Sequence, residues 1–205
     1  LNDPISSRSR KTKEFIVECD VVFLLSYLGQ FMSAEDIGFL NKEIGAANIK
    51  EAFIIGSKLD SGILDYNGIQ GCTIFDAYQA SKNNYMEQGY KVIKEQASMP
   101  YSADVFKVLN QKSLEGQEVI YLVSSVMFGA AKALIKGKRY SAEEENIIKR
   151  MKRRFTGFRE DSDFMLALAG IDKLKIAVLD ATRTRKDEII KKRRNGETWG
   201  IPYRS

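Results

Sequence analysis

Three short apolar runs constrain the fold of this 205-residue sequence more than any other feature. They are rich in Val, Ile, Leu and Phe, they are continuous and not alternating in polarity, and they occupy residues 21–25, 52–55 and 119–123. Strands that are apolar on both faces are typical of parallel sheets covered by helices. The sequence therefore predicts a parallel sheet of about three strands.

Helical segments lie between these runs, as parallel strands require. Ser33 and Asp36 resemble a capping box ahead of residues at helical spacing, and further helices are predicted over 76–96 and from 124 to 134. Strand and helix thus alternate along the chain. We expect an α/β fold with a mostly parallel, partial sheet flanked by helices.

More helices follow the last strand. Ser141 and Glu144 form a capping box that opens a helix through Phe155, which has one apolar and one basic face. The stretch 166–192 is predicted to be one further long helix, and the residues after Asn195 have no periodicity. The fold class is therefore an α/β unit followed by C-terminal helices.

Composition excludes several classes of protein. The sequence contains two cysteines and no histidine, which excludes a Cys/His zinc site and a Cys/His catalytic pair. Sparse cysteine favours a reducing, cytoplasmic setting, and no apolar run approaches the roughly 20 residues of a membrane span. The formal charge of +5 gathers in 149–159 and 183–194, so peripheral contact with a membrane stays open.

The segment FIIGSKLD, residues 53–60, carries the clearest chemical pattern. It runs from a buried strand into a turn at the carboxyl edge of the sheet, where open α/β folds bind ligands. The Asp60 carboxylate can accept two parallel hydrogen bonds from guanine N1 and N2, which adenine does not offer, and the stem of Lys58 can lie along the ring. Taken alone, the Lys-x-Asp pattern is equally that of a solvated strand-end turn.

A second small-residue turn follows the next strand. YLVSSVMFGAAKA, residues 121–133, places Ser124 and Ser125 at a junction between strand and helix. A backbone N–H at such a junction can approach the guanine O6 closely. The two turns together make guanine the predicted ligand.

Both turns resemble GTPase motifs. FIIGSKLD resembles the fourth motif, (N/T)KxD, and YLVSS resembles the fifth. The opening LNDPISSRSR resembles the switch II segment that follows the DxPG motif in bacterial dynamin-like GTPases, and residues 163–193 resemble the end of their G domain and the start of the neck helix. We therefore expect the true N-terminus to precede Leu1.

The resemblance implies a division of the chain and a set of site residues. Residues 1–172 would be a partial G domain, from switch II through the fifth motif, and 173–205 the start of a helical neck with a loose tail. Asp3 would belong to switch II, although an Asp before Pro4 is also a common turn starter, and that simpler interpretation is favoured. The implied guanine-binding residues are Ser57, Lys58, Asp60, Ser124 and Ser125.

Two departures from the family pattern limit the expected activity. Ser57 stands where Asn or Thr is usual, and the sequence contains no GxxxxGK(S/T) loop. Phosphoryl transfer depends on that loop and on the Mg²⁺ that it helps to hold. We therefore assign no catalytic or metal-binding residue. We expect GTP or GDP to bind with Mg²⁺ only in the complete protein, where GTP hydrolysis would drive membrane remodelling or self-assembly.

The expected partners follow from these assignments. They are a guanine nucleotide, a second copy of the chain and an anionic membrane surface, whereas nucleic acid is not expected. Two alternatives remain open at this point. In the first, the chain is a nucleotide-independent interaction module that uses its basic helices on a membrane or an acidic partner. In the second, it is a gene remnant with no function of its own.

Overall fold

The computed structural model describes residues 21–43, 51–66 and 72–194, of which residues 43, 185 and 188–194 are described by their backbone alone. The chain divides into two compact units, Leu1–Ile171 and Asp172–Ser205. In the described ranges, no helix combines the length and the apolar character needed to cross a bilayer.

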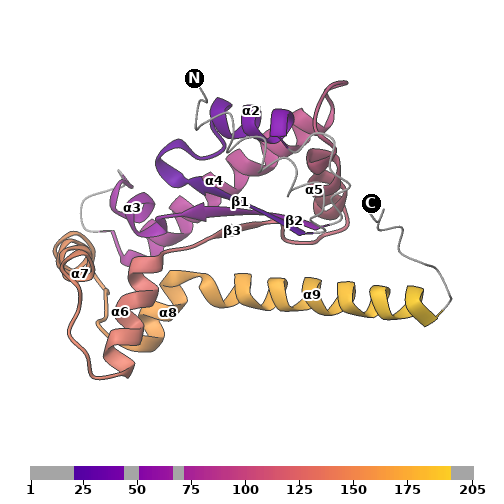
Figure 1. The fold of residues 1–205 in the computed structure, drawn as a ribbon. Coiled ribbons are helices and arrows are strands. Elements are labelled where there is room, and N and C mark those ends of the chain that lie inside the picture. The colour runs from indigo at the N-terminus through magenta and orange to yellow at the C-terminus, as the bar shows by residue number, and fades with distance from the viewer. Residues whose placement is uncertain (1–20, 44–50, 67–71, 195–205) are drawn as a thin grey trace, which may run out of the picture. The chain divides into compact units, whose positions relative to one another are not determined.

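A three-stranded parallel sheet organises the first unit (Figure 1). Its strands are β1 (Val21–Tyr27), β2 (Glu51–Ser57) and β3 (Ile120–Leu122), in the spatial order β1-β2-β3. The pairing aligns Ile54 with Ile120 and ends at the carboxyl side with Gly56 opposite Leu122. The structure thus confirms the predicted α/β class and the three predicted strands.

The helices between the strands lie largely on one face of the sheet, where Figure 1 shows α2, α4 and α5. Ser33 and Asp36 exchange the hydrogen bonds of the predicted capping box at the start of α2. Thr73 and Asp76 make an equivalent box at the start of α4. The elements in this part of the chain are η1 (Leu28–Gln30), α2 (Ala34–Glu43), α3 (Leu59–Leu64), α4 (Ile74–Ala97) and α5 (Asp104–Leu114).

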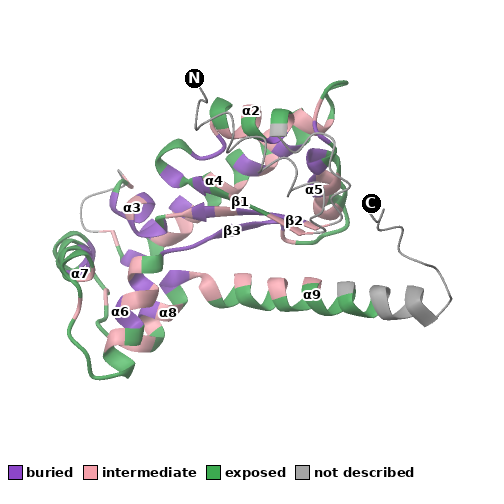
Figure 2. Cartoon of the chain, in the orientation of Figure 1, coloured by how far each residue is buried: buried purple, intermediate pink, exposed green. Residues whose placement is uncertain are grey.

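Much of the core lies between the sheet and these helices, and it continues among the helices that follow β3 (Figure 2). Ile54 and Ile120 from the sheet and Phe106 from α5 are at most 1% exposed. Helix α4 approaches β3 so closely that a Cβ on Gly89 would lie 2.6 Å from the Ile120 side chain. Burial of these side chains supplies the main stabilisation of the sheet, at about 1.5–3 kcal/mol for each large residue.

Three helices follow β3 in the same unit: α6 (Ser125–Ile135), α7 (Ala142–Arg154) and α8 (Ser162–Ala169). Ser141 and Glu144 form the predicted capping box of α7. The predicted apolar face, Ile147, Ile148, Met151 and Phe155, is buried, with Phe155 as the C-cap of the helix. Helices α6 and α8 pack against each other.

The predicted single helix over 166–192 is wrong. The structure has two helices here, α8 and α9 (Ile171–Arg194), which are separated by Gly170 in the left-handed conformation with φ 68°. A Cβ on Gly170 would lie 2.3 Å from the carbonyl oxygen of Leu122. The glycine therefore lets the chain turn while its backbone touches the end of β3.

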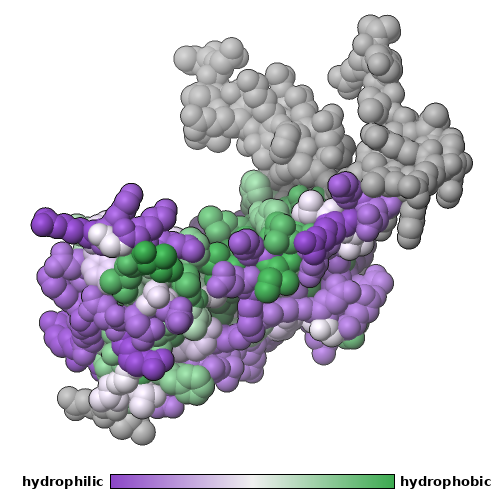
Figure 3. Space-filling model, turned by 90° about the horizontal axis from the view of Figure 1, so that it is seen from below, coloured by the Kyte–Doolittle hydropathy of each residue, from purple (hydrophilic) through white to green (hydrophobic). Residues whose placement is uncertain are grey.

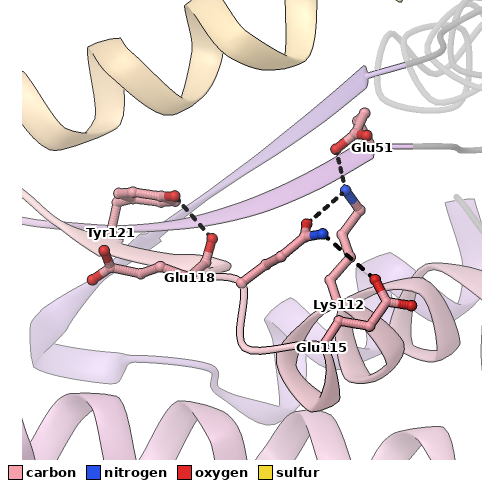
Figure 4. Close-up of polar contacts among 6 residues, drawn as sticks. Glu51, Lys112, Glu115, Glu118 and Tyr121 are labelled. Carbon is pink, nitrogen blue, oxygen red and sulfur yellow. Dashed lines mark hydrogen bonds and ion pairs between the residues drawn. The ribbon is translucent and has the colours of Figure 1, made fainter. Parts of the chain in front are cut away.

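A polar cluster holds the amino end of the sheet, opposite the carboxyl ends of the strands (Figure 4). The Lys112 ammonium at the end of α5 lies 2.5 Å from the Glu51 carboxylate at the start of β2. Gln117 contacts the same ammonium at 3.4 Å. The Tyr121 hydroxyl donates to the Glu118 carbonyl at 2.8 Å. These contacts fix where β3 enters the sheet.

Strand β1 carries large hydrophobic side chains at the surface. Phe23, Leu25 and Tyr27 are 44%, 66% and 47% exposed and alternate with the buried or half-buried Leu24 and Ser26. The Phe23 ring stacks on Phe53 of β2 with centroids 5.5 Å apart. The face of the molecule drawn in Figure 3 likewise shows hydrophobic residues at the surface among hydrophilic ones.

Candidate functional site

The carboxyl ends of β2 and β3 bring the two predicted turns together. Helix α3 begins almost directly after β2, and α6 begins soon after β3. The amide of Leu59 donates to the Val123 carbonyl at 3.0 Å, and the amide of Val123 donates to the Gly56 carbonyl at 2.8 Å. The two turns are therefore joined backbone to backbone at one edge of the sheet.

Asp60 and Ser124 form the centre of this site. The Ser124 hydroxyl donates to Oδ1 of Asp60 at 2.5 Å, across a separation of 64 residues in sequence. The same hydroxyl accepts from the Met127 amide at 3.1 Å and so caps the start of α6. Ser124 is fully buried and Asp60 is 2% exposed. Two of the predicted residues are thus in direct contact.

The second carboxylate oxygen of Asp60 is held less firmly. The neighbouring Ser61 hydroxyl lies 3.5 Å from Oδ2, which is a long hydrogen bond. Asp60 also lies in the first turn of α3, where the helix dipole favours a negative charge. A buried carboxylate needs such partners. A ligand could therefore replace the contact at Oδ2 at a lower free-energy cost than the contact at Oδ1.

Lys58 adopts an uncommon backbone conformation at the turn between β2 and α3. Its φ of 61° and ψ of 46° lie in the left-handed region, which costs a residue with a side chain about 1–3 kcal/mol and is often found at functional sites. The exposed side chain places its Nζ atom 5.4 Å from the centre of the Tyr27 ring. The Lys58 side chain is therefore directed over the end of β1 and not towards the carboxylate of Asp60, two residues further along the chain.

Ser57 belongs to a separate network at the end of β1. Its hydroxyl donates to the Ser26 carbonyl at 3.2 Å. The buried Ser26 hydroxyl in turn donates to Asp36 at 2.7 Å and accepts from the Met32 amide at 3.0 Å. Ser57 therefore braces β1 against β2, whereas none of its contacts in the described ranges reaches Asp60.

Ser125, the last predicted base-binding residue, is the first residue of α6 and is exposed. At this position its backbone N–H belongs to the group of helix N-terminal amides that have no partner within the helix. It lies next to Ser124 and hence close to the Asp60 carboxylate. Asp3 and the predicted switch II segment lie outside the described residues.

Helix α3 is fixed to the rest of the unit by contacts that the sequence did not indicate. The Ser81 hydroxyl of α4 donates to the Gly62 carbonyl at 3.1 Å. A Cβ on Gly62 would lie 2.8 Å from the Tyr85 ring, so the absence of a side chain lets the two helices meet. Ser26, Tyr27 and Ser61 are further residues near the site that the sequence did not indicate. The roles of Ser26 and Tyr27 depend on contacts between the ends of β1 and β2, whereas Ser61 contacts the adjacent Asp60.

In the described ranges, no group of three or more acidic or sulfur-bearing side chains is arranged to hold a metal ion. No known protein family, no curated protein and no solved structure matches this chain.

Proposed function

We propose that the joined turns after β2 and β3 form the guanine-binding part of a dynamin-like GTPase. The observation that supports this proposal most strongly is the contact between Asp60 and Ser124. This contact joins two turns that were indicated separately by the sequence. The first was indicated by its carboxylate, and the second by its small residues at a strand-to-helix junction. The carboxyl edge of a parallel sheet is also where α/β proteins bind their ligands.

The chemistry of the site follows from three groups. The Asp60 carboxylate accepts hydrogen bonds from the guanine N1–H and N2–H₂ groups, and adenine lacks both donors. The backbone N–H at Ser125 donates to the guanine O6. The aliphatic stem of Lys58, whose ammonium lies over the Tyr27 ring in this structure, would turn towards the base and lie along its plane.

The burial of Asp60 sets the strength of binding. Because the residue is 2% exposed and its carboxylate contacts Ser124 and Ser61, the base must displace the long Ser61 contact before it pairs with Oδ2. The sequence also lacks the phosphate-binding loop. We therefore expect weak guanine binding and no hydrolysis by this chain, while the complete protein would couple GTP hydrolysis to membrane remodelling or self-assembly.

A titration with GDP and ADP tests the proposal. Amide resonances near Ser124 and Ser125, followed by NMR, should shift with GDP at lower concentration than with ADP. Asp60→Asn should abolish this preference, whereas Asp65→Asn, which removes a nearby exposed carboxylate, should retain it. Equal responses of the wild-type chain to both nucleotides would contradict the proposal. Robust GTP turnover that Asp60→Asn abolishes would contradict the expected lack of hydrolysis.

A further inference from the structure

A pocket lies at the end of α6 away from Ser124. It has a volume of about 510 Å³, which is within the range of small-molecule sites. Leu134, near the end of α6, is part of its wall, and lies about 14 Å along the helix axis from Ser125. The pocket is therefore separate from the proposed base site. Its lining residues are Leu134, Lys138, Arg139, Tyr140, Glu145, Ile148, Lys149, Lys152 and Glu160.

The charges around the pocket are unbalanced. Four cationic and two acidic side chains line it, which leaves a surplus of two positive charges. Lys149 pairs with Glu145 at 2.8 Å and Lys152 contacts Glu160. Within the part of the chain that the structure describes, no carboxylate pairs with the adjacent cations Lys138 and Arg139. The surplus charge thus belongs to the loop between α6 and α7.

Tyr140 adds a neutral donor to the same loop. Its hydroxyl is buried, and among the described residues it has no hydrogen-bond partner of good geometry. Burial, together with the nearby Glu160 carboxylate, raises the pKa of Tyr140 to about 12. The hydroxyl therefore keeps its proton at neutral pH. Its contact with Glu160 does not meet hydrogen-bond geometry, so a phosphate oxygen that entered the pocket could accept a better aligned hydrogen bond.

We propose that this pocket binds a phosphate monoester. The dianion matches the surplus of two charges, the Arg139 guanidinium can hold two phosphate oxygens in parallel, and Lys138 and Tyr140 supply further donors. Leu134 and Ile148 form an apolar wall for the organic part of the ester. The ester is either a soluble compound or the head group of a phosphorylated lipid.

Phenyl phosphate is a suitable soluble probe because it combines the dianion with an apolar group. Its binding to the full chain, measured by NMR titration, should weaken by about tenfold or more in Arg139→Ala and in Tyr140→Phe, since each loses a hydrogen bond to a charged group. Lys107→Ala removes a surface cation that is paired with Asp104 outside the pocket and should leave the affinity unchanged. Asp60→Asn should also leave it unchanged, which separates this site from the proposed base site.

Vesicles distinguish the two sources of the ester. Phosphatidylcholine vesicles that contain a phosphatidylinositol monophosphate are compared with vesicles in which phosphatidylserine supplies the same charge. Retention by the first kind alone, lost in Arg139→Ala, assigns the site to a lipid head group. Binding of phenyl phosphate without retention assigns it to a soluble ester. Failure of both probes, or equal binding by folded Arg139→Ala and Tyr140→Phe, would overturn the proposal.

Discussion

At the scale of single residues, Ser124 makes two hydrogen bonds that hold the candidate site together. Its hydroxyl donates to the buried Asp60 carboxylate and accepts from the Met127 amide. The sequence placed Ser124 at a strand-to-helix junction, which is a local property. It did not show that the side chain would bridge two turns, because that contact depends on the register between β2 and β3.

Ser124→Ala should therefore destabilise the fold. The substitution leaves a buried carboxylate without its closest donor, which costs about 1–3 kcal/mol, and it also removes the helix cap. Urea unfolding, followed by circular dichroism, measures the change. Ser125→Ala alters the adjacent but exposed residue and should change stability by less than about 0.5 kcal/mol. Similar stabilities for the two variants would contradict the bridging role.

Two tyrosines should make the fold sensitive to alkali. Burial, with the Glu118 carboxylate as a second cause, raises the pKa of Tyr121 to about 12, and Tyr140 has a similar value. Because the folded pKa exceeds the unfolded value of about 10, this contribution to stability is complete below about pH 10 and is lost as the pH rises towards 12. Phenolate absorbance should show a late step, which is smaller in Tyr121→Phe. Titration of every tyrosine near pH 10 would contradict the raised pKa values of Tyr121 and Tyr140.

At the scale of elements, periodicity and capping predicted most helices and strands. The boxes at Ser33 and Ser141 start α2 and α7 as expected. Helices α3 and α5 were missed. α3 has only six residues, too few to show a period, and neither helix has a side-chain cap at its start. Their formation depends on packing against α4 more than on local sequence.

The break at Gly170 was missed for a similar reason, since a single glycine inside a helical pattern can be tolerated. Its role can be tested by comparing two glycines with positive φ. Gly170→Ala should destabilise by at least about 2 kcal/mol, because backbone strain is added to a clash with the Leu122 carbonyl. Gly137 has φ 61°, but a Cβ added there would meet nothing within 4 Å. Gly137→Ala should therefore lower the stability less than Gly170→Ala does. Thermal unfolding measures both, and equal losses would show that the contact with β3 is unimportant.

At the scale of the whole molecule, the sequence predicted the class of the fold and the edge of the sheet at which the two candidate turns meet. Continuous apolar strands indicated a parallel sheet, and the turns after two of them were singled out as binding elements. The sequence did not show how deeply Asp60 is buried or which residues contact it. Asp60 is 2% exposed, and Ser57 braces β1 instead of joining the carboxylate. Both properties arise from contacts between segments distant in sequence.

The most direct test of the proposed guanine site is a reversal of base preference. Xanthine carries a carbonyl where guanine carries the N2 amine, so the amide of Asp60→Asn can donate to that carbonyl while it accepts from N1–H. NMR titration with GDP and xanthosine diphosphate should show that the wild-type chain prefers GDP and that Asp60→Asn prefers the xanthosine nucleotide. The same preference in both chains, or none in either, would contradict a role for Asp60 in reading the base.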